Sequence, residues 1–312
     1  MNRRALIVTH RSREEAVQAT NEAIRELERV GFEIVHDADD VDLTGVEIAV
    51  VLGGDGTILR AAEVTRGTDI PILGVNLGHV GFLAESERED IHEAVRRLAA
   101  RDYEVEERTT LDVSIAVPGE SELRTDWALN EATVEKDDRA RMIEVLIEVD
   151  GRPLSTFGCD GVVMSTATGS TAHAFSAGGP VVWPEVDAML LVPISAHALF
   201  ARPLVVGPAS VLALEILPKT GAIGVLSCDG RRCTAMPAGS RVEVRRSNVP
   251  VRLARLSQAP FTDRLVSKFS LPVVGWRGSP AGLIGAEPEP ALAIGNPIGN
   301  PIGSPADPTR EG

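Results

Sequence analysis

Short apolar runs alternate with amphipathic segments over the N-terminal third of the chain. Four of these runs cover residues 5–8, 32–35, 48–52 and 71–75 and consist mainly of Ala, Val, Ile and Leu. Such runs are typical of strands buried on both faces of a parallel sheet, with helices in the crossover connections. The pattern therefore predicts an α/β domain over residues 1–108.

The first amphipathic segment has both a start signal and a stop signal. Ser12 and Glu15 match a capping box, and Gly31 is of the type that commonly ends a helix. The apolar side of the predicted helix consists of four residues, Val17, Ile24, Leu27 and Val30. We expect this side to pack on the sheet.

After residue 108 the chain consists mainly of short strand-like segments separated by turn residues. The predicted strands cover 111–117, 127–134, 143–149, 205–217, 223–227, 241–246 and 251–256. Asp150 and Gly151 are typical of a tight hairpin turn. The pattern predicts an all-β, sandwich-like domain over residues 109–261, after which we expect the chain to return to the first domain at about 262–276.

The C-terminal segment has a different composition. From Gly278 onward it is rich in Gly, Pro and Ala, and a short Asn-Pro-Ile-Gly repeat occurs within it. Proline prevents regular helix and central strand, so we predict a disordered tail over residues 277–312.

The segment Gly53-Gly54-Asp55-Gly56-Thr57 lies between the apolar run 48–52 and a helix-like segment, 58–63. Glycines allow a ligand to approach the backbone, and the free amides at the start of a helix favour phosphate. A carboxylate in such a site costs energy unless it takes a proton, orients a hydroxyl or holds a metal, so Asp55 indicates phosphoryl transfer. The alternative is a tight turn in which Asp55 caps the helix.

Three further segments carry polar residues at positions that suit a ligand. Residues 74–85 contain three close glycines together with Asn76 and with His79, which is either a base or an ordinary loop histidine. Asn130 and Glu131 lie in a predicted strand, where they face opposite ways unless a bulge or a strand end intervenes. Residues 159–180 are mainly small or hydroxylated and favour a narrow surface for sugar hydroxyls or a flat base.

Charge and cysteine content limit the class of protein. The formal net charge of −14 argues against nucleic-acid or membrane partners, so an anionic substrate needs backbone amides, selected arginines or a bound cation. The cysteines Cys159, Cys228 and Cys233 are odd in number and form no close pair, which favours reduced, buried thiols. No secretion signal is evident, and Pro184 and Pro193 interrupt the apolar stretch 181–200. We expect a cytoplasmic protein.

Taken in order, these motifs resemble the NAD kinase family. GGDGT, GVNLGHVGFLAE, LNEATVEK and DGVVMSTATGSTAHAFSAGGPVV follow one another as in that family, and the resemblance extends from about Ala5 to Trp276. GGDGT alone also resembles lipid kinases and phosphofructokinases. The resemblance implies phosphorylation of the adenosine-ribose 2′-hydroxyl of NAD, with ATP, polyphosphate or both as donor and Mg²⁺ or another divalent metal as cofactor.

The resemblance also implies roles for individual residues. Asp55 accepts or orients the hydroxyl proton. The implied phosphate-binding residues are Gly53, Gly54, Gly56, Thr57 and Arg60. The implied NAD-binding residues are Asn76, Asn130, Glu131, Asp160, Thr168, Thr171, Ala172, His173, Ser176, Ala196 and Asp229. No residue is assigned to a metal, because the substrate phosphates are expected to hold it, and the family implies a homodimer or homotetramer.

Two residues depart from the pattern of the family, and two alternative functions remain open. His173 stands where the family commonly has tyrosine, and Ala167 stands where proline is common, which affects the expected contact with a stacked base. Asp229 followed by Gly230 also predicts a hairpin turn first and a ligand contact second. A non-catalytic NAD(P) sensor would need the pocket but not Asp55, and a lipid kinase would need a membrane-facing surface that this acidic chain lacks.

Overall fold

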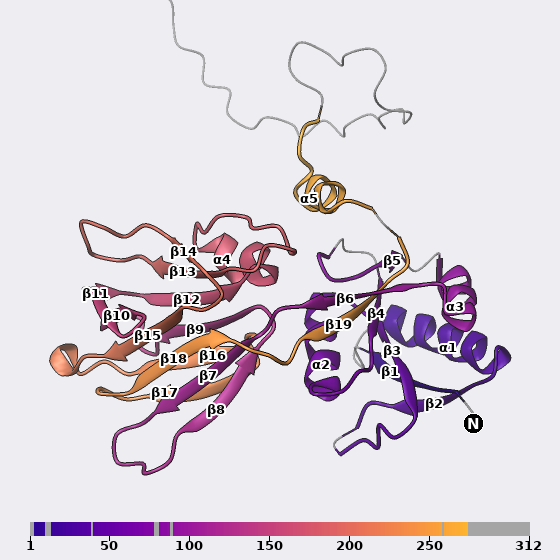
Figure 1. Cartoon of the computed structure of the whole chain (residues 1–312), viewed down its shortest axis with the longest axis horizontal. Helices are drawn as coiled ribbons and strands as arrows, with labels where there is room; N and C mark the ends of the chain where they lie inside the picture. The colour runs from indigo at the N-terminus through magenta and orange to yellow at the C-terminus, as the bar shows by residue number, and fades with distance from the viewer. Residues whose placement is uncertain are drawn as a thin grey trace, which may run out of the picture. The chain divides into compact units, whose positions relative to one another are not determined.

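The described part of the chain forms three β-sheets (Figure 1). The computed structural model describes residues 3–9, 14–38, 40–77, 81–87, 90–257 and 259–273. The described residues up to Leu271 belong to one compact unit. The predicted tail, 277–312, lies outside the described residues, as does His79.

The first sheet has seven strands in the order β2-β1-β3-β4-β19-β6, with β5 beside β4. Its strands are β1 (Arg3–Thr9), β2 (Phe32–His36), β3 (Val46–Leu52), β4 (Ile72–Asn76), β5 (Ser86–Glu87), β6 (Glu104–Arg108) and β19 (Val251–Arg255). Neighbouring strands are parallel except for β19 and β6, which are antiparallel. The apolar runs therefore form the predicted parallel core.

Helices cover both faces of this sheet. They are α1 (Glu14–Arg29), α2 (Asp55–Thr65) and α3 (Ile91–Ala100). Side chains of α1 and α3 share a core cluster with Ala5 and Ile7, whereas α2 packs with Leu6 and Val8 on the opposite face. Successive strand residues face opposite ways, so β1 alone shows that both faces are buried.

The predicted apolar side of α1 is partly wrong. Val17 is 44% exposed, and the buried positions are instead taken largely by Ala16, Ala19 and Ala23 together with Leu27. The small alanine side chains let the helix lie close to the sheet. A prediction based on large apolar residues does not detect such an alanine face. The side chains of Ser12 and Glu15 lie outside the described part.

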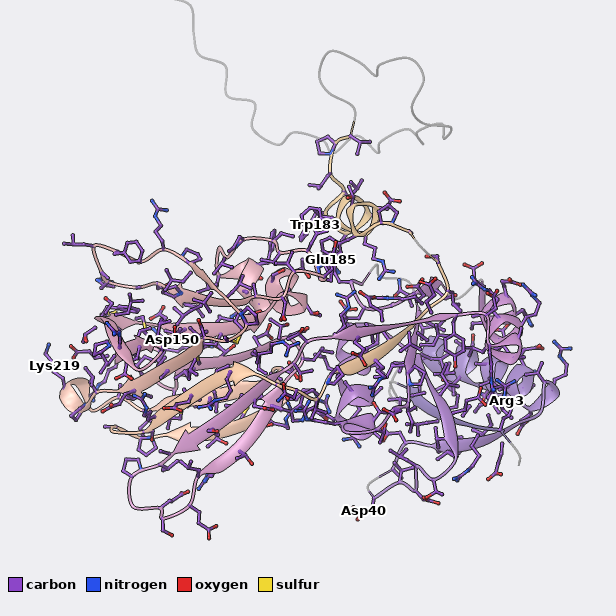
Figure 2. The ribbon with its side chains drawn as sticks, viewed as in Figure 1. Arg3, Asp40, Asp150, Trp183, Glu185 and Lys219 are labelled. Carbon is purple, nitrogen blue, oxygen red and sulfur yellow. The ribbon has the colours of Figure 1, made fainter. Side chains whose placement is uncertain are left out.

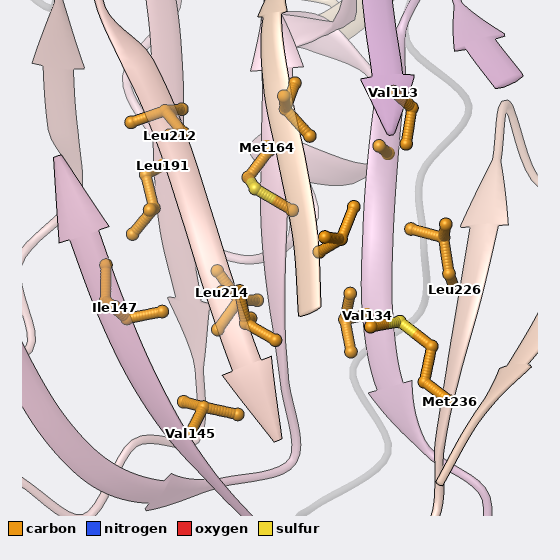
Figure 3. Close-up of a cluster of buried hydrophobic side chains, with 14 of the residues drawn as sticks. Val113, Val134, Val145, Ile147, Met164, Leu191, Leu212, Leu214, Leu226 and Met236 are labelled. Carbon is orange, nitrogen blue, oxygen red and sulfur yellow. The ribbon is translucent and has the colours of Figure 1, made fainter. Parts of the chain in front are cut away.

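Two six-stranded antiparallel sheets form the β-rich half. One has the order β11-β10-β15-β18-β7-β8 and the other β14-β13-β12-β9-β16-β17. The strands are β7 (Leu111–Ala116), β8 (Arg124–Ala128), β9 (Glu131–Lys136), β10 (Ile143–Val149), β11 (Arg152–Cys159), β12 (Gly161–Thr166), β13 (Met189–Ile194), β14 (Leu204–Val206), β15 (Val211–Ile216), β16 (Gly224–Cys228), β17 (Arg232–Met236) and β18 (Arg241–Arg246). One buried cluster takes Val145 and Leu214 from the first and Met164 and Leu226 from the second, as a sandwich requires (Figure 3).

Three boundaries differ from the predictions. The expected strand 127–134 is two strands, β8 and β9, which belong to different sheets. The expected strand 205–217 is divided by a turn between Gly207 and Ser210. Residues 251–255 return to the first sheet as β19, so the predicted end of the second domain at 261 is wrong. An apolar alternation shows that a strand exists but not which sheet it joins.

Short helices complete the described chain. They are the 3₁₀ helices η2 (Thr168–Thr171) and η3 (Pro218–Thr220), and the α-helices α4 (His173–Ser176) and α5 (Phe261–Phe269). None of the helices in the described ranges is long and apolar enough to cross a membrane. Cys159 and Cys228 are buried as predicted, but Cys233 is exposed.

Candidate active site

Asp55 is the first residue of α2, directly after the turn that follows β3. The turn begins at Gly53, whose N–H donates to the carbonyl of Val75 in the neighbouring strand β4 at 3.0 Å. The carboxylate is partly buried, and each oxygen accepts one backbone N–H, Oδ2 from Phe82 and Oδ1 from Leu83, both at 3.1 Å. A segment that follows β4 therefore holds the carboxylate in one orientation.

Gly81 allows this close approach. A Cβ at Gly81 would lie 3.0 Å from Cγ of Asp55 and closer still to Oδ1, so any side chain there would displace the carboxylate. Gly54 and Gly56 are exposed, and a Cβ at either would meet no atom within 4 Å. The turn is thus closed toward the protein and open toward solvent. We call Asp55, Gly81, Phe82 and Leu83 the Asp55 cluster.

The other predicted phosphate-binding residues have protein partners. Gly53 packs on Thr57, since a Cβ at Gly53 would lie only 2.5 Å from the threonine hydroxyl oxygen. Arg60 forms ion pairs with Asp37 at 3.2 Å and with Glu63 at 3.6 Å. Two acidic partners weigh against a guanidinium that is open to phosphate, and the role of Arg60 stays a prediction.

The chain passes from one sheet of the sandwich to the other at Asn130. Asp229, in the hairpin between β16 and β17, holds this crossing: its Oδ2 accepts the N–H of Leu129 at 2.9 Å, and its Oδ1 accepts those of Asn130 at 2.7 Å and Glu131 at 3.3 Å. We call Leu129, Asn130, Glu131 and Asp229 the Asn130 cluster. Because a break separates the two strands, neighbouring side chains here do not follow the alternation of a single strand.

Glu131 has an unusual environment. It is 7% exposed, its carboxyl group lies near the backbone N–H of His173, and Oε2 is buried and has no hydrogen-bond partner in the described part of the chain. Burial and the charge of Asp229 raise the pKa of Glu131 to about 8. The side chain therefore carries a proton at neutral pH and can donate a hydrogen bond.

The segment of small and hydroxylated residues, 159–180, is packed directly against Asn130. A Cβ at Gly169 would overlap the carbonyl oxygen of Asn130, so this approach requires glycine. The hydroxyl of Thr166 donates to the carbonyl of Leu129 at 2.7 Å, and that of Ser165 to the carbonyl of Asn130 at 3.1 Å. These hydroxyls hold the crossing in place, in addition to any surface that the segment offers to a ligand.

The remaining predicted NAD-binding residues lie around this crossing. Thr168 is buried and its hydroxyl accepts a 3.5 Å hydrogen bond from Arg108, which comes from the α/β half. The N–H of Asp160 donates to Ile194 at 3.0 Å, which brings the segment leading to Ala196 beside it.

Lys136 forms a 2.6 Å ion pair with Asp160 and holds the pKa of that carboxyl below its ordinary value. Asn76, at the end of β4, is 3% exposed. Four further predicted NAD-binding residues, in or between η2 and α4, are partly or fully exposed: Thr171, Ala172, His173 and Ser176. The roles of all these residues toward NAD stay predictions.

Aromatic contacts connect the Asp55 cluster with α5 and α4. The ring centroid of Phe82 lies 5.8 Å from that of Phe269 in α5, and Phe269 lies 4.6 Å from Phe175 in α4. Trp183, labelled beside α5 in Figure 2, lies 5.3 Å from Phe261. The row of rings therefore runs from the Asp55 cluster through α5 to α4, and the first residue of α4, His173, has its backbone N–H near the carboxyl group of Glu131.

Sequence reasoning missed several of these residues. Gly81 was visible only as one of three close glycines, and nothing in the sequence connected it with Asp55. Arg108 ends a strand with several charged residues, and its burial at 5% exposure depends on the return of β19 beside it. Phe82 and Leu83 act through their backbone amides, which leave no signal in side-chain identity.

Comparison with known proteins places the chain in a family. The model of the ATP-NAD kinase N-terminal domain matches residues 7–103, and that of the ATP-NAD kinase C-terminal domain matches residues 129–256. An NAD kinase of Leifsonia xyli subsp. xyli is 68% identical over 233 residues, which are 75% of this chain and 76% of that protein. An NAD kinase of Thermobifida fusca is 54% identical over 305 residues, covering 90% of this chain and 93% of the relative.

Solved structures agree with the fold. The crystal structure of an NAD kinase from Archaeoglobus fulgidus in complex with ATP has a TM-score of 0.68 at 27% identity, covering 86% of this chain and all of that one (100%). Yeast NADH kinase complexed with NADH has a TM-score of 0.79 at 21% identity, covering 88% of this chain and 89% of that chain, and shares the fold.

The α/β half with its glycine turn, the sandwich and these matches together define a phosphotransferase. The chain belongs to the NAD kinase family.

Proposed function

We propose that this chain transfers the terminal phosphoryl group of ATP, of polyphosphate or of both to the 2′-hydroxyl of the adenosine ribose of NAD, giving NADP. The ribose oxygen forms a bond to phosphorus while the bond from that phosphorus to the bridging oxygen of the donor breaks. The hydroxyl proton passes to Asp55, and ADP or a polyphosphate one unit shorter leaves. Atoms and charges then balance without a further reactant.

The orientation of Asp55 carries this proposal. Each carboxylate oxygen accepts one amide N–H, so each keeps a lone pair with which to accept the proton of a hydroxyl. Gly54 and Gly56 leave open space at the start of α2, and the N-terminus of a helix favours a phosphoryl group. A base beside a phosphate site is the arrangement that phosphoryl transfer to an alcohol needs.

The Asn130 cluster supports the acceptor side of the proposal. Protonated Glu131 offers a buried hydrogen-bond donor, and Asn130 beside it offers a side-chain amide. Together with Asp160, Thr168, Thr171, Ala172, His173, Ser176 and Ala196 they would surround ribose hydroxyls and a base. The 27% identical relative crystallised with ATP supports a nucleotide donor.

Magnesium is proposed to reach the site on the phosphates of the donor. Among the described residues, no group of three or more His, Cys, Asp or Glu side chains is arranged to hold a metal ion. When bound, the ion would neutralise charge on the transferring group. The residues of this chain then bind, orient and deprotonate the acceptor.

We further propose that the chain acts as a cytoplasmic homodimer or homotetramer. The exposed apolar residues Leu199 and Phe200 follow Ala196 closely and would be covered by a second copy. Light scattering on purified protein measures the assembly, and a monomer at micromolar concentration would contradict this part of the proposal.

The test of the activity is NADP formation by purified protein given NAD, Mg²⁺ and either ATP or polyphosphate, with Asp55→Asn run in parallel. Product from the wild type with one donor, and almost none from the variant, is the expected result and identifies the donor. Binding of NAD or NADP without product from either donor would favour a non-catalytic NAD(P) sensor. Phosphoryl transfer to a lipid but not to NAD would favour a lipid kinase.

A further inference from the structure

Asp55 is held by a segment whose carbonyl groups are themselves held from the C-terminal part of the chain. The carbonyl of Phe82 accepts a hydrogen bond from Arg264 of α5 at 3.2 Å, and that of Leu83 accepts one from Arg255 of β19 at 3.2 Å. The N–H groups of the same two residues donate to Asp55. The segment is therefore fixed on both sides.

One peptide group joins Arg264 to the catalytic candidate. The carbonyl of Phe82 and the N–H of Leu83 belong to the same peptide plane, so the charge of Arg264 polarises the group that donates to Oδ1 of Asp55. Hydrogen bonds arranged in such a chain strengthen one another. The guanidinium thus acts on the carboxylate through a rigid planar unit without touching it.

Glu85 keeps the two arginines in place. Its side chain is 1% exposed, and Oε2 forms ion pairs with Arg264 at 2.6 Å and with Arg255 at 2.9 Å. Its Oε1 accepts the N–H and the hydroxyl of Ser257 at 2.8 and 3.0 Å. A buried carboxylate with this many donors fixes the positions of both guanidinium groups.

The helix that carries Arg264 is held in turn by aromatic packing. Phe261 and Phe269, on either side of it in α5, both lie 5.8 Å from Phe82. No residue of α5 is fully buried, so these rings and the Arg264 ion pair account for much of its attachment. The position of α5 and the position of the Asp55 cluster are therefore coupled.

We propose that Arg264 is a positioning residue for Asp55: through the peptide group between Phe82 and Leu83 it sets the orientation of the carboxylate for proton transfer. This inference rests on the proposed catalytic role of Asp55. It assigns the C-terminal helix, which lies beyond the matched kinase domains at 7–103 and 129–256, a part in the reaction.

The test compares Arg264→Gln, Arg264→Lys and the matched control Lys268→Gln, which removes one positive charge from the exposed side of the same helix. We expect Arg264→Gln to lower kcat about tenfold with little change in KM for NAD, because a misplaced base affects the transition state more than binding. Arg264→Lys keeps the charge and should fall between wild type and Arg264→Gln. Lys268→Gln should match wild type.

Two further readouts separate positioning from stability. In an Asp55→Asn background, Arg264→Gln should cause no further fall in kcat, since residues that act as a unit are not additive. Added guanidinium ion should restore part of the kcat of Arg264→Gln, because the Arg264 side chain is 17% exposed and the space it leaves is reachable.

Each contrary result is informative. An unchanged kcat in Arg264→Gln, or an equal fall in the Asp55→Asn background, overturns the positioning role while the catalytic role of Asp55 stands. Near-normal activity of Asp55→Asn by itself overturns the catalytic role first and the positioning role with it.

Discussion

Asp55 and Asp229 use the same kind of bond for opposite purposes. Both carboxylates accept backbone N–H groups from a segment distant in sequence, two for Asp55 and three for Asp229. The side chain of Asp229 is 1% exposed and also meets Arg232 at 3.5 Å, whereas Asp55 is partly exposed and lies beside open glycines. The carboxylate of Asp229 uses its lone pairs to hold the backbone of the protein. The carboxylate of Asp55 keeps lone pairs with which it can accept a hydrogen bond from a ligand.

The difference shows how to separate a structural carboxylate from a reactive one. Burial raises the pKa of Asp229, while its amide donors and Arg232 act in the opposite direction. Among the described residues, its neighbour Glu131 has one backbone N–H nearby, that of His173, and no cation that lowers its pKa, so Glu131 is the member of the pair that holds a proton. The number of donors and the access of solvent decide the role, and residue type does not.

The strongest test of the comparison is Asp55→Asn. The amide keeps the shape of the side chain but is a poor base, so we expect folding and NAD binding to persist while kcat falls by about 10²–10⁴-fold. Steady-state kinetics and calorimetric titration with NAD measure the two properties separately. A variant that turns over at the wild-type rate would remove the distinction between the two aspartates.

Asp229→Ala should act on stability. It leaves three buried N–H groups without their acceptor and removes one of several acceptors of Arg232, and we expect a loss of about 3–5 kcal/mol in the free energy of unfolding. Urea unfolding of the variant and the wild type measures this loss of stability.

Asp150 provides a matched control for Asp229. It occupies another hairpin turn with the same positive φ of 53°, and its carboxylate also accepts a backbone N–H, that of Val211 at 2.8 Å, but at an exposed site. Asp150→Ala therefore carries the same backbone strain and should cost only about 0.5–1.5 kcal/mol. Equal losses in the two variants would show that burial of the Asn130 crossing is unimportant.

Gly81→Ala should affect activity through Asp55. The new Cβ would overlap the carboxylate, and displacement of a catalytic group by about 1 Å can cost about 10²-fold in rate. Gly207→Ala is the control, because a Cβ there meets no atom within 4 Å. If both variants keep the wild-type kcat, the carboxylate moves aside without consequence and its observed orientation does not matter.

The smallest expected effect concerns the pH dependence of stability at Glu131. Its pKa rises from 4.5 to about 8 on folding, so the folded chain binds the proton more tightly and wild-type stability from this group falls as the pH rises through about 8. Glu131→Gln does not titrate.

The difference in unfolding free energy between Glu131→Gln and wild type should grow by about 1 kcal/mol between pH 7 and pH 8. Thermal and urea unfolding of both proteins at these two pH values measure the change. A constant difference would mean that Glu131 is ionised in the folded protein at both values.

Much of the architecture was predictable because it depends on local pattern. The runs at 48–52 and 71–75 became β3 and β4, and Asp150 with Gly151 joined β10 to β11 as a hairpin. The strand predicted over 127–134 failed at Asn130, since alternation continues through a point where the chain changes sheets. The return of β19 was equally hidden, because its sequence would suit either half.

The sequence by itself determined the strand–turn–helix around Asp55, the order of the family motifs and the division into an α/β part and a β-rich part. These follow from short-range chemistry: the freedom of glycine, the period of apolar residues and the residue types at a turn. Only the tertiary structure decided that Phe82 and Leu83 hold Asp55 and that Asp229 holds Asn130. It also decided that Arg264 binds the carbonyl of Phe82, which lies 182 residues away along the chain. Those contacts run through backbone amides and carbonyls, which every residue has, so side-chain identity could not reveal them.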